Sequence, residues 1–290
     1  MEQQGNGASS FTSAVSLNKL GVSSIPRRYV LPPSQRPSPH LPISTTLPII
    51  DLSTLRDQSL VSRSTINEIR IACKEIGCFQ VINHGIDQSV MDEALEVSTQ
   101  FFNLPSAEKM RLFSEDVHKP YRIGFTCGLQ IRQTTVTYMK KSMEGRKHLP
   151  CPEPGLTLGI HPHSDYGSIT VLLQTRSGLE IKDKNNNWMS VPFVEGALVV
   201  QLGDQMEVMS NGQYKSVIHR ATVNGDEKRF SIVSLHSFAM DRKTGPAVEL
   251  VDDQHPKSYK EFCFREFLDF ISCNDITKGR FVDTLKLNRP

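Results

Sequence analysis

The stretch from residue 156 to residue 236 constrains the fold most, because it holds a series of short apolar runs separated by turn signals. The runs are rich in Val, Ile, Leu and Thr, and the breaks include Lys-Asn-Asn-Asn at 184–187 and Ser-Asn-Gly at 210–212. Short strands at regular spacing are typical of an all-β sandwich or barrel. The sequence therefore predicts a double-sheet jelly roll, with strands over 156–163, 168–174, 179–182, 188–192, 197–202, 205–209, 216–223 and 229–236.

Helical patterns flank these strands on both sides. Apolar side chains recur at helical spacing over about 64–76, 89–102 and 262–271. In the second of these helices we expect Val90, Ala94, Val97 and Phe101 to form the buried stripe. The predicted fold class is thus mainly β with flanking helices, built on a jelly-roll (double-stranded β-helix) core with a helical N-terminal region.

Shifts in composition and pattern divide the chain into five regions. Seven of the 17 prolines fall between Pro26 and Pro48, so we expect residues 1–47 to form a stiff, extended, proline-rich leader. The boundaries that we predict for the other regions are 48–118 for the N-terminal region, 119–149 for a connector, 150–240 for the jelly-roll core and 241–290 for a C-terminal helix and tail.

The composition is that of an ordinary globular chain and argues against several function classes. With 38% hydrophobic residues, 22% charged residues and a formal net charge of +2, the chain shows no dense basic face for nucleic acid. No apolar run approaches the length of a membrane span, and no secretory signal is visible. The six cysteines are scattered without a Cys-x-x-Cys pair, which is typical of free thiols in a reducing compartment. Since no apolar heptad is visible either, we expect a cytoplasmic monomer that binds neither nucleic acid nor membrane.

A His-x-Asp motif, His163-Ser164-Asp165, lies between two predicted strands, and His219 follows it within a third. Two imidazoles and one carboxylate are the facial triad of a non-haem iron(II) oxygenase, which leaves three coordination positions open for reactants. Ligands at strand ends are held rigidly. We therefore predict that His163, Asp165 and His219 bind Fe(II).

Two alternatives to this ligand set stay open at this point. His161 also offers an imidazole, as His161-Pro162-His163, but a cupin-type site would need a Glu a few residues on, and the next one is Glu180. Three protein ligands and a water also describe the catalytic zinc site of a hydrolase.

Arg229 and Ser231 favour the oxygenase over the zinc hydrolase. Two residues apart on a predicted strand, they share one face and can hold a carboxylate by charge-assisted hydrogen bonds. Their strand is apolar at Ile232, Val233 and Leu235, and a charged Arg in a half-buried strand needs a partner. Iron ligands beside a carboxylate clamp indicate an enzyme that activates dioxygen with the help of a 2-oxo acid.

With these residues assembled, the chain resembles the plant 2-oxoglutarate- and iron(II)-dependent dioxygenases, a family that includes flavanone 3-hydroxylase, flavonol synthase and the gibberellin oxidases. The resemblance covers most of the chain. It rests on Pro-Ile-Ile-Asp-Leu at 48–52, Gly-Cys-Phe-Gln-Val-Ile-Asn-His-Gly at 77–85, Phe-Phe-Asn-Leu-Pro at 101–105, Pro-Cys-Pro-Glu-Pro at 150–154, the segments 163–170 and 210–220, Gly-Asp at 203–204, Arg-Phe-Ser at 229–231 and the tail 260–287.

The resemblance implies a role for each of these residues. It assigns iron to His163, Asp165 and His219, and the distal carboxylate of 2-oxoglutarate to Arg229 and Ser231. The implied reaction consumes dioxygen and 2-oxoglutarate and hydroxylates or desaturates a small plant specialised metabolite, with flavonoids favoured. A relative that uses ascorbate in place of 2-oxoglutarate is an alternative.

Phe238, just past the strand of Arg229 and Ser231, lies where the resemblance places a substrate-facing aromatic side chain. A position in the hydrophobic core is the alternative for this residue, and the sequence slightly favours it. Phe238 is nevertheless a candidate substrate contact.

One segment departs from the family pattern. Between about Lys119 and Pro150 the chain is markedly shorter, and the family's tryptophan-bearing stretch and long central helix are missing. The family also has a strand with Asn-x-Tyr just before Pro-Cys-Pro, whereas Lys-His-Leu at 147–149 stands here, so the Tyr that helps to hold 2-oxoglutarate has no counterpart. The shortened connector leaves a truncated, catalytically impaired isoform as an alternative.

Overall fold

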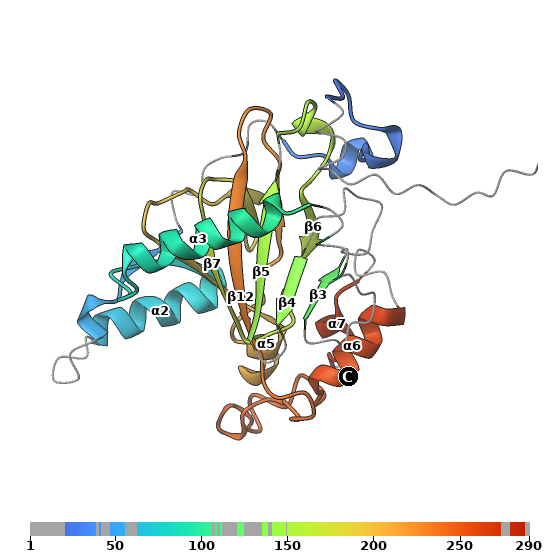
Figure 1. Cartoon of the computed structure of the whole chain (residues 1–290). Coiled ribbons are helices and arrows are strands. Elements are labelled where there is room, and N and C mark those ends of the chain that lie inside the picture. Colours follow the sequence, from blue (N-terminus) through green and yellow to red (C-terminus); the bar gives the residue numbers. More distant parts are fainter. Residues whose placement is uncertain are drawn as a thin grey trace, which may run out of the picture.

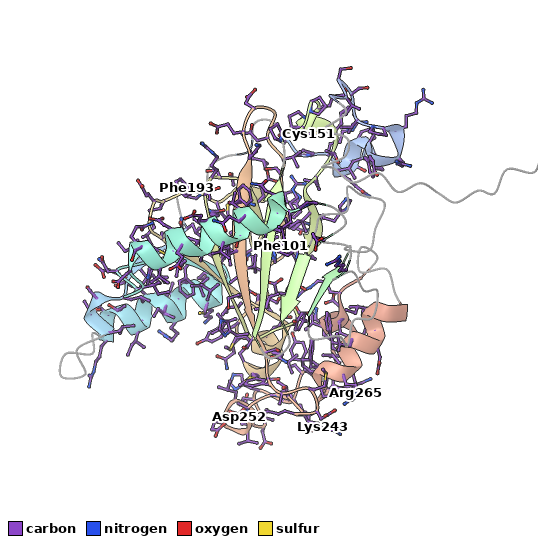
Figure 2. The ribbon with its side chains drawn as sticks, in the orientation of Figure 1. Phe101, Cys151, Phe193, Lys243, Asp252 and Arg265 are labelled. Carbon is purple, nitrogen blue, oxygen red and sulfur yellow. The ribbon has the colours of Figure 1, made fainter. Side chains whose placement is uncertain are left out.

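The computed structural model of the chain describes residues 21–38, 41, 47–55, 63–105, 108, 111, 121–124, 135–138, 141–148, 150–273 and 279–287. In these ranges two β-sheets form the centre of the molecule, and two long helices, α2 (Arg63–Glu75) and α3 (Gln88–Asn103), lie across one of them (Figure 1). Figure 2 shows the side chains on the same ribbon, with Phe101 near the end of α3. The mainly β class with flanking helices is therefore confirmed.

The larger sheet has six strands in the order β1-β2-β10-β7-β12-β5. β1 pairs in parallel with β2, and the other neighbouring pairs are antiparallel. The predicted connector contributes β5, so a strand of this segment completes the sheet beside β12. The strands are β1 (Ile49–Asp51), β2 (Cys78–Ile82), β10 (Leu198–Leu202), β7 (Ile169–Gln174), β12 (Arg229–His236) and β5 (Lys141–His148).

The smaller sheet has four strands in the order β6-β11-β8-β9, and a separate two-stranded sheet joins β3 to β4. The division of the chain into five regions stays a prediction. The strands of these two sheets are β6 (Ile160–His163), β11 (His219–Ala221), β8 (Leu179–Lys182), β9 (Trp188–Ser190), β3 (Tyr121–Gly124) and β4 (Thr135–Tyr138). Short 3-10 turns are η1 (Arg27–Tyr29), η2 (Pro33–Gln35), η3 (Ser53–Leu55), η4 (Pro154–Leu156) and η5 (Val248–Leu250).

The two main sheets face each other across a shared apolar core. Alternate residues of a strand point to opposite faces, so each sheet offers one apolar face to the other. Leu172 and Val199 of the larger sheet pack with Leu179 and Ile181 of the smaller one in a single buried cluster. This packing is that of a jelly-roll sandwich, and the metal-ligand motif lies at the edge of the core.

Helices α2 and α3 cover the outer face of the larger sheet. Ala72 and Cys73 of α2 and Met91 of α3 are buried against Phe79 and Leu198 of the sheet. The expected burial of Val90 and Val97 was wrong, because these side chains are 54% and 57% exposed. Helix residues advance by about 100° each, so a helix that buries Met91 and Phe102 turns Val90 and Val97 outward and leaves Ala94 and Phe101 half-buried.

One predicted strand, over 205–209, was wrong. The segment forms α5 (Asp204–Met209), whose first turn closes when the amides of Met206 and Glu207 donate to the carbonyl of Gly203. A run of five residues is too short for periodicity to separate a strand from a helix. Asp204 and Glu207 in the first turn also favour the helix, because negative side chains interact favourably with the positive N-terminal end of the helix dipole.

The C-terminal part of the chain packs against α5. It contains α6 (Phe264–Cys273) and α7 (Phe281–Thr284). Val208 of α5 is fully buried in a cluster with Tyr259, Phe262, Phe281 and Val282. Among the helices of the described ranges, none combines the length and the apolar character that crossing a bilayer requires.

Three buried cysteines are expected to resist alkylation in the native protein. Burial raises the pKa of Cys73 to about 11, and it also raises the pKa of Cys78 and of Cys151, so the reactive thiolate is scarce near neutral pH. Cys263 is a free, half-exposed thiol. Brief treatment with iodoacetamide at about pH 8, followed by peptide mass spectrometry, should modify Cys263 before these three buried cysteines. Denaturation in urea is the control, and equal native rates for all four would contradict the fold.

Candidate metal centre and co-substrate pocket

Pairing of two strands in the smaller sheet brings three possible metal ligands together. His163 ends β6, and Asp165 follows in the turn toward β7. His219 begins β11, which runs antiparallel to β6 and places His219 opposite His163. Oδ1 of Asp165 is 3.7 Å from Nε2 of each histidine. One donor atom from each residue lies within 4.8 Å of the other two, so a single ion can reach all three.

Each of these side chains is oriented through the atom that faces away from the common centre. Nδ1 of His163 and Nδ1 of His219 each donate to the backbone carbonyl two residues earlier, over 2.7 and 3.2 Å. A carbonyl only accepts hydrogen bonds, so Nδ1 carries a proton and Nε2 is the ring nitrogen left to bind a metal. Oδ2 of Asp165 accepts a 2.5 Å hydrogen bond from Thr170. Neutral imidazoles, a carboxylate and such supporting bonds fit a divalent transition metal.

His161 does not belong to this group. The three residues brought together are His163, Asp165 and His219, whereas His161 supplies the carbonyl that orients His163. Because successive residues of a strand alternate, His161 shares a face with His163 but lies one pleat further from the turn. His161, the alternative ligand, therefore supports His163 through its backbone carbonyl.

Arg229 and Ser231 are buried on β12, where they are 4% and 2% exposed. Nη2 of Arg229 donates to Oε1 of Gln174 at 2.8 Å, and its Nε donates to the carbonyl of Arg176 at 3.2 Å. These bonds to neutral oxygens fix the plane of the guanidinium. Gly178 gives it room, because a Cβ at this glycine would lie only 3.0 Å from Cδ of Arg229.

One cavity joins the metal-ligand group to this clamp. The three predicted metal ligands and the two predicted clamp residues all line it. Gln201 and apolar side chains that include Leu172, Val233 and Leu235 complete the lining. Gln201 is 2% exposed, and in the described part of the chain its Nε2 has no hydrogen-bond partner. A buried polar atom without a partner is costly, so this amide is suited to bind a polar ligand in the cavity.

Strand β5 takes the place expected for the Asn-x-Tyr strand. It precedes Pro150 and pairs with the clamp strand, with His148 opposite Arg229 and Arg146 opposite Ser231. Cross-strand partners lie on the same face of a sheet, so positions 146 and 148 share the face of the clamp. The shortened connector therefore keeps the strand but has no tyrosine at this register.

Phe238 does not line this cavity. It lies beyond β12, where its backbone amide donates to Oε1 of Gln205 at 3.2 Å. The guanidinium of Arg242 stacks over its ring at 4.3 Å. The ring is half-buried, and its proposed contact with substrate stays a prediction.

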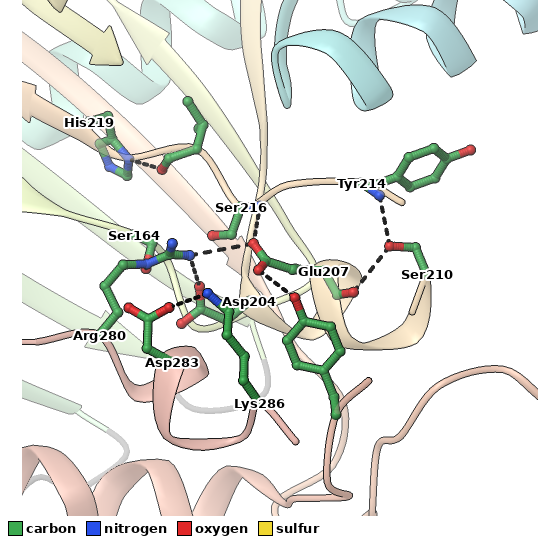
Figure 3. Close-up of polar contacts among 12 residues, drawn as sticks. Ser164, Asp204, Glu207, Ser210, Tyr214, Ser216, His219, Arg280, Asp283 and Lys286 are labelled. Carbon is green, nitrogen blue, oxygen red and sulfur yellow. Dashed lines mark hydrogen bonds and ion pairs between the residues drawn. The ribbon is translucent and has the colours of Figure 1, made fainter. Parts of the chain in front are cut away.

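Charged side chains of α5 and of the C-terminal segment meet near Ser164, the residue between His163 and Asp165 (Figure 3). Arg280 faces the carboxylates of Asp204 and Glu207 at 3.2 and 3.5 Å, and both carboxylates are 2% exposed. Burial raises the pKa of Asp204 to about 6, although the charge of Arg280 opposes this rise. Tyr259 donates to Glu207 at 2.8 Å, and desolvation together with this carboxylate raises the pKa of its phenol.

Family models match two overlapping parts of the chain. Residues 136–237 match the 2OG-Fe(II) oxygenase superfamily, and residues 47–163 match the model for the N-terminal region of a non-haem dioxygenase in morphine synthesis. The rice (Oryza sativa subsp. japonica) 2-oxoglutarate-dependent dioxygenase 21, chloroplastic, is 32% identical, and the alignment covers 88% of this chain and 95% of that protein. The chain thus belongs to the 2OG-Fe(II) oxygenase superfamily.

Other relatives agree with this assignment. Rice flavanone 3-dioxygenase 3 is 32% identical over 89% of this chain and 98% of its own length. The crystal structure of JOX2 in complex with 2OG, Fe and JA superposes with a TM-score of 0.76 at 27% identity, covering 90% of this chain and 93% of that chain. The predicted family, the jelly-roll fold, the class of 2-oxoglutarate-dependent dioxygenase and its Fe(II) and 2-oxoglutarate are therefore confirmed at the level of the family.

The relatives also bear on the shortened segment. The alignment with the rice dioxygenase 21 runs over 316 positions, which exceeds the 290 residues of this chain. That relative therefore contains internal residues without a counterpart here, as the predicted loss of an internal segment requires.

Sequence reasoning missed several residues that the site uses. Gln174 holds Arg229, Thr170 holds Asp165, and Gln201 lines the cavity. All three are polar residues at inward positions of otherwise apolar strands, and this exception to the period-2 pattern is the signal that could have found them. Arg280 carried no such local signal.

Proposed function

We propose that this chain is a 2-oxoglutarate-dependent oxygenase that hydroxylates or desaturates a small plant specialised metabolite, with Fe(II) held by His163, Asp165 and His219. The observation that carries the proposal is the common centre of three oriented donor atoms within 4.8 Å, which opens into the cavity of Arg229 and Ser231. Zinc hydrolysis gives no reason for a buried carboxylate clamp in the same cavity.

The three ligands set the charge and access of the metal centre. Both histidines ligate as neutral imidazoles, and Asp165 supplies one negative charge, so a divalent ion keeps a net charge of about +1. This charge attracts an anionic co-substrate. When bound, Fe(II) supplies the activation of dioxygen that is coupled to oxidative decarboxylation of a 2-oxo acid.

The opposite end of the cavity recognises the co-substrate. Arg229 carries a fixed planar fork that matches a carboxylate, and the hydroxyl of Ser231 on the same face donates a further hydrogen bond. Gln201 adds an amide donor to the cavity wall. Leu172 and Val233 keep the wall between these polar groups apolar, which excludes water and strengthens the electrostatic contacts.

The relatives indicate the class of substrate. Their names include flavanone 3-dioxygenase 3 from rice, jasmonate-induced oxygenase 3 from Arabidopsis thaliana and codeine O-demethylase from Papaver somniferum. Two of these names give a small plant metabolite as the substrate, a flavanone and codeine, and the third names jasmonate as the inducer. We propose a substrate of this kind, with a flavonoid as the first to test.

Anaerobic titration with Fe(II) and 2-oxoglutarate tests the proposed function most directly. We expect one equivalent of each to bind and the charge-transfer absorption band of the ternary complex to develop. On admission of dioxygen, a flavanone, a jasmonate and a methylated alkaloid are compared by succinate formed and by product mass. Succinate should form in proportion to the substrate consumed, and absence of the band at saturating Fe(II) would contradict the proposal.

A second candidate is a chain that binds both ligands without turnover. It is favoured by one observation, the absence of a tyrosine from β5 at the register of Arg229 and Ser231. In that case the absorption band would develop, but no tested substrate would yield succinate in proportion to its consumption. A relative that uses ascorbate would instead turn over without forming succinate.

We further propose that the protein acts as a cytoplasmic monomer on small molecules and dioxygen. Four cysteines of the described ranges, Cys73, Cys78, Cys151 and Cys263, are free thiols, and free thiols are typical of a reducing compartment. The near-neutral net charge of +2 supports a small-molecule substrate rather than nucleic acid.

A further inference from the structure

The C-terminal segment 279–287 brings one side chain to the turn that carries two of the proposed metal ligands. Nε of Arg280 donates to Oγ of Ser164 at 3.0 Å, and Ser164 stands between His163 and Asp165 in the chain. Figure 3 shows Arg280 between Ser164 and the carboxylates of α5. The donor and the acceptor of this hydrogen bond are therefore 116 residues apart in the chain.

The same guanidinium is bound by the carboxylate of Asp204, and the backbone amide of this residue also holds the turn. Nη2 of Arg280 donates to Oδ1 of Asp204 at 3.2 Å. The backbone amide of Asp204 donates to the carbonyl of Asp165 at 2.7 Å. At Gly203 the backbones approach so closely that a Cβ would lie 2.3 Å from the carbonyl oxygen of Gly167. The start of α5 thus binds the main chain of the turn, and Arg280 binds the side chain of Ser164 in it.

A second path leads from Arg280 to the strand of His219. Nη2 of Arg280 is 3.5 Å from Oε2 of Glu207, and this oxygen accepts a 2.8 Å hydrogen bond from the amide of Ser216. Ser216 lies three residues before His219 on the approach to β11. One half-buried guanidinium therefore links both segments that supply the proposed ligands, and its planar fork has the geometry that a lysine lacks.

We propose that Arg280 is a positioning residue for the metal centre: through Ser164 and Glu207 it holds the ligand-bearing segments at the spacing that Fe(II) needs. The inference rests on the proposed function, because it takes His163, Asp165 and His219 as the ligands. Outer partners that orient metal ligands typically change metal affinity by about 10–100-fold when removed.

Two variants remove the contact with Ser164 and keep the positive charge at position 280. Ser164→Ala deletes the acceptor, and Arg280→Lys keeps a cation beside Asp204 and Glu207 but loses the fork. We expect each variant to weaken Fe(II) binding about tenfold, measured by anaerobic titration in the presence of 2-oxoglutarate. The double variant should bind no more weakly than the weaker single variant, because both changes break the same contact.

Two further measurements separate positioning from general stability. The ligand-field spectrum of the Co(II)-loaded protein should change in Ser164→Ala, while its melting temperature without metal should stay close to that of the native chain. Arg265→Gln is the matched control, because this exposed arginine of the C-terminal region pairs with Asp241 at 2.8 Å. Its Fe(II) affinity should equal that of the native chain.

Native-like Fe(II) affinity and Co(II) spectra in both single variants would overturn the inference alone. Strictly additive losses in the double variant would also overturn it, because Arg280 would then not act through Ser164. A native chain that binds no Fe(II) would overturn the proposed function together with this inference.

Discussion

Replacing Asp165 by alanine is expected to abolish Fe(II) binding, with an affinity lowered by more than about a hundredfold, since loss of an outer-shell partner alone costs about 10–100-fold. Oδ1 of Asp165 lies 3.7 Å from both imidazole Nε2 atoms, and Asp165 is the one carboxylate of the described ligand group. Alanine leaves two neutral donors and no negative charge, which is not a facial triad. Because the metal organises the reactants, 2-oxoglutarate should also lose its charge-transfer band.

Iron content after anaerobic loading and desalting measures this effect, and circular dichroism checks that the fold is retained. Asp253→Ala is the matched control, because it removes an exposed carboxylate far from the group in sequence. Asp165→Ala removes the acceptor of the Thr170 hydroxyl, which costs about 1–3 kcal/mol of stability. The double variant Asp165→Ala/Thr170→Val also removes the unpaired hydroxyl, so that the test does not depend on folding. One equivalent of iron in either Asp165 variant would refute the assigned ligands.

The candidate metal-ligand group could be proposed from the sequence because the chemistry of its first two members is local. His163 and Asp165 stand two residues apart at a strand end, and the turn signal at Gly167 marks where that strand stops. The pairing of His219 with His163 was not visible, since register depends on how distant strands meet. Period-2 patterns nevertheless placed the segments of His163 and His219 in strands. In a β-sandwich two such strands can pair, so the sequence was compatible with contact between the two histidines.

Other features were beyond sequence reasoning for identifiable physical reasons. The run at 205–209 was short and apolar, and only its capping by Gly203 and its contact with the C-terminal cluster make it a helix. The rotation of α3 about its axis depends on which face the sheet accepts, so Val90 and Val97 were assigned to the wrong side. Arg280 meets Ser164 across 116 residues, and no local pattern encodes such a contact.

Replacing Arg229 by alanine is expected to weaken 2-oxoglutarate binding by about a hundredfold, because truncating one partner of a buried, hydrogen-bonded charge pair costs about 2–5 kcal/mol. Arg229→Lys should cost less, about tenfold, since it keeps the charge but loses the bidentate fork. Ser231→Ala removes one neutral donor and should also weaken binding by about tenfold, at about 1.5 kcal/mol for a hydrogen bond to a charged group.

Titration of 2-oxoglutarate into the Fe(II)-loaded protein measures all three affinities. Arg70→Ala is the matched control, because it removes an exposed arginine of α2 whose guanidinium donates to Oδ1 of Asn67 on the same helix. Fe(II) affinity without 2-oxoglutarate should stay unchanged in every variant, since none of them alters a ligand. If Arg229→Ala and Arg229→Lys bound 2-oxoglutarate equally well, the guanidinium fork would not recognise the carboxylate. Its burial between Gln174 and Gly178 would then serve the packing of the sheets alone.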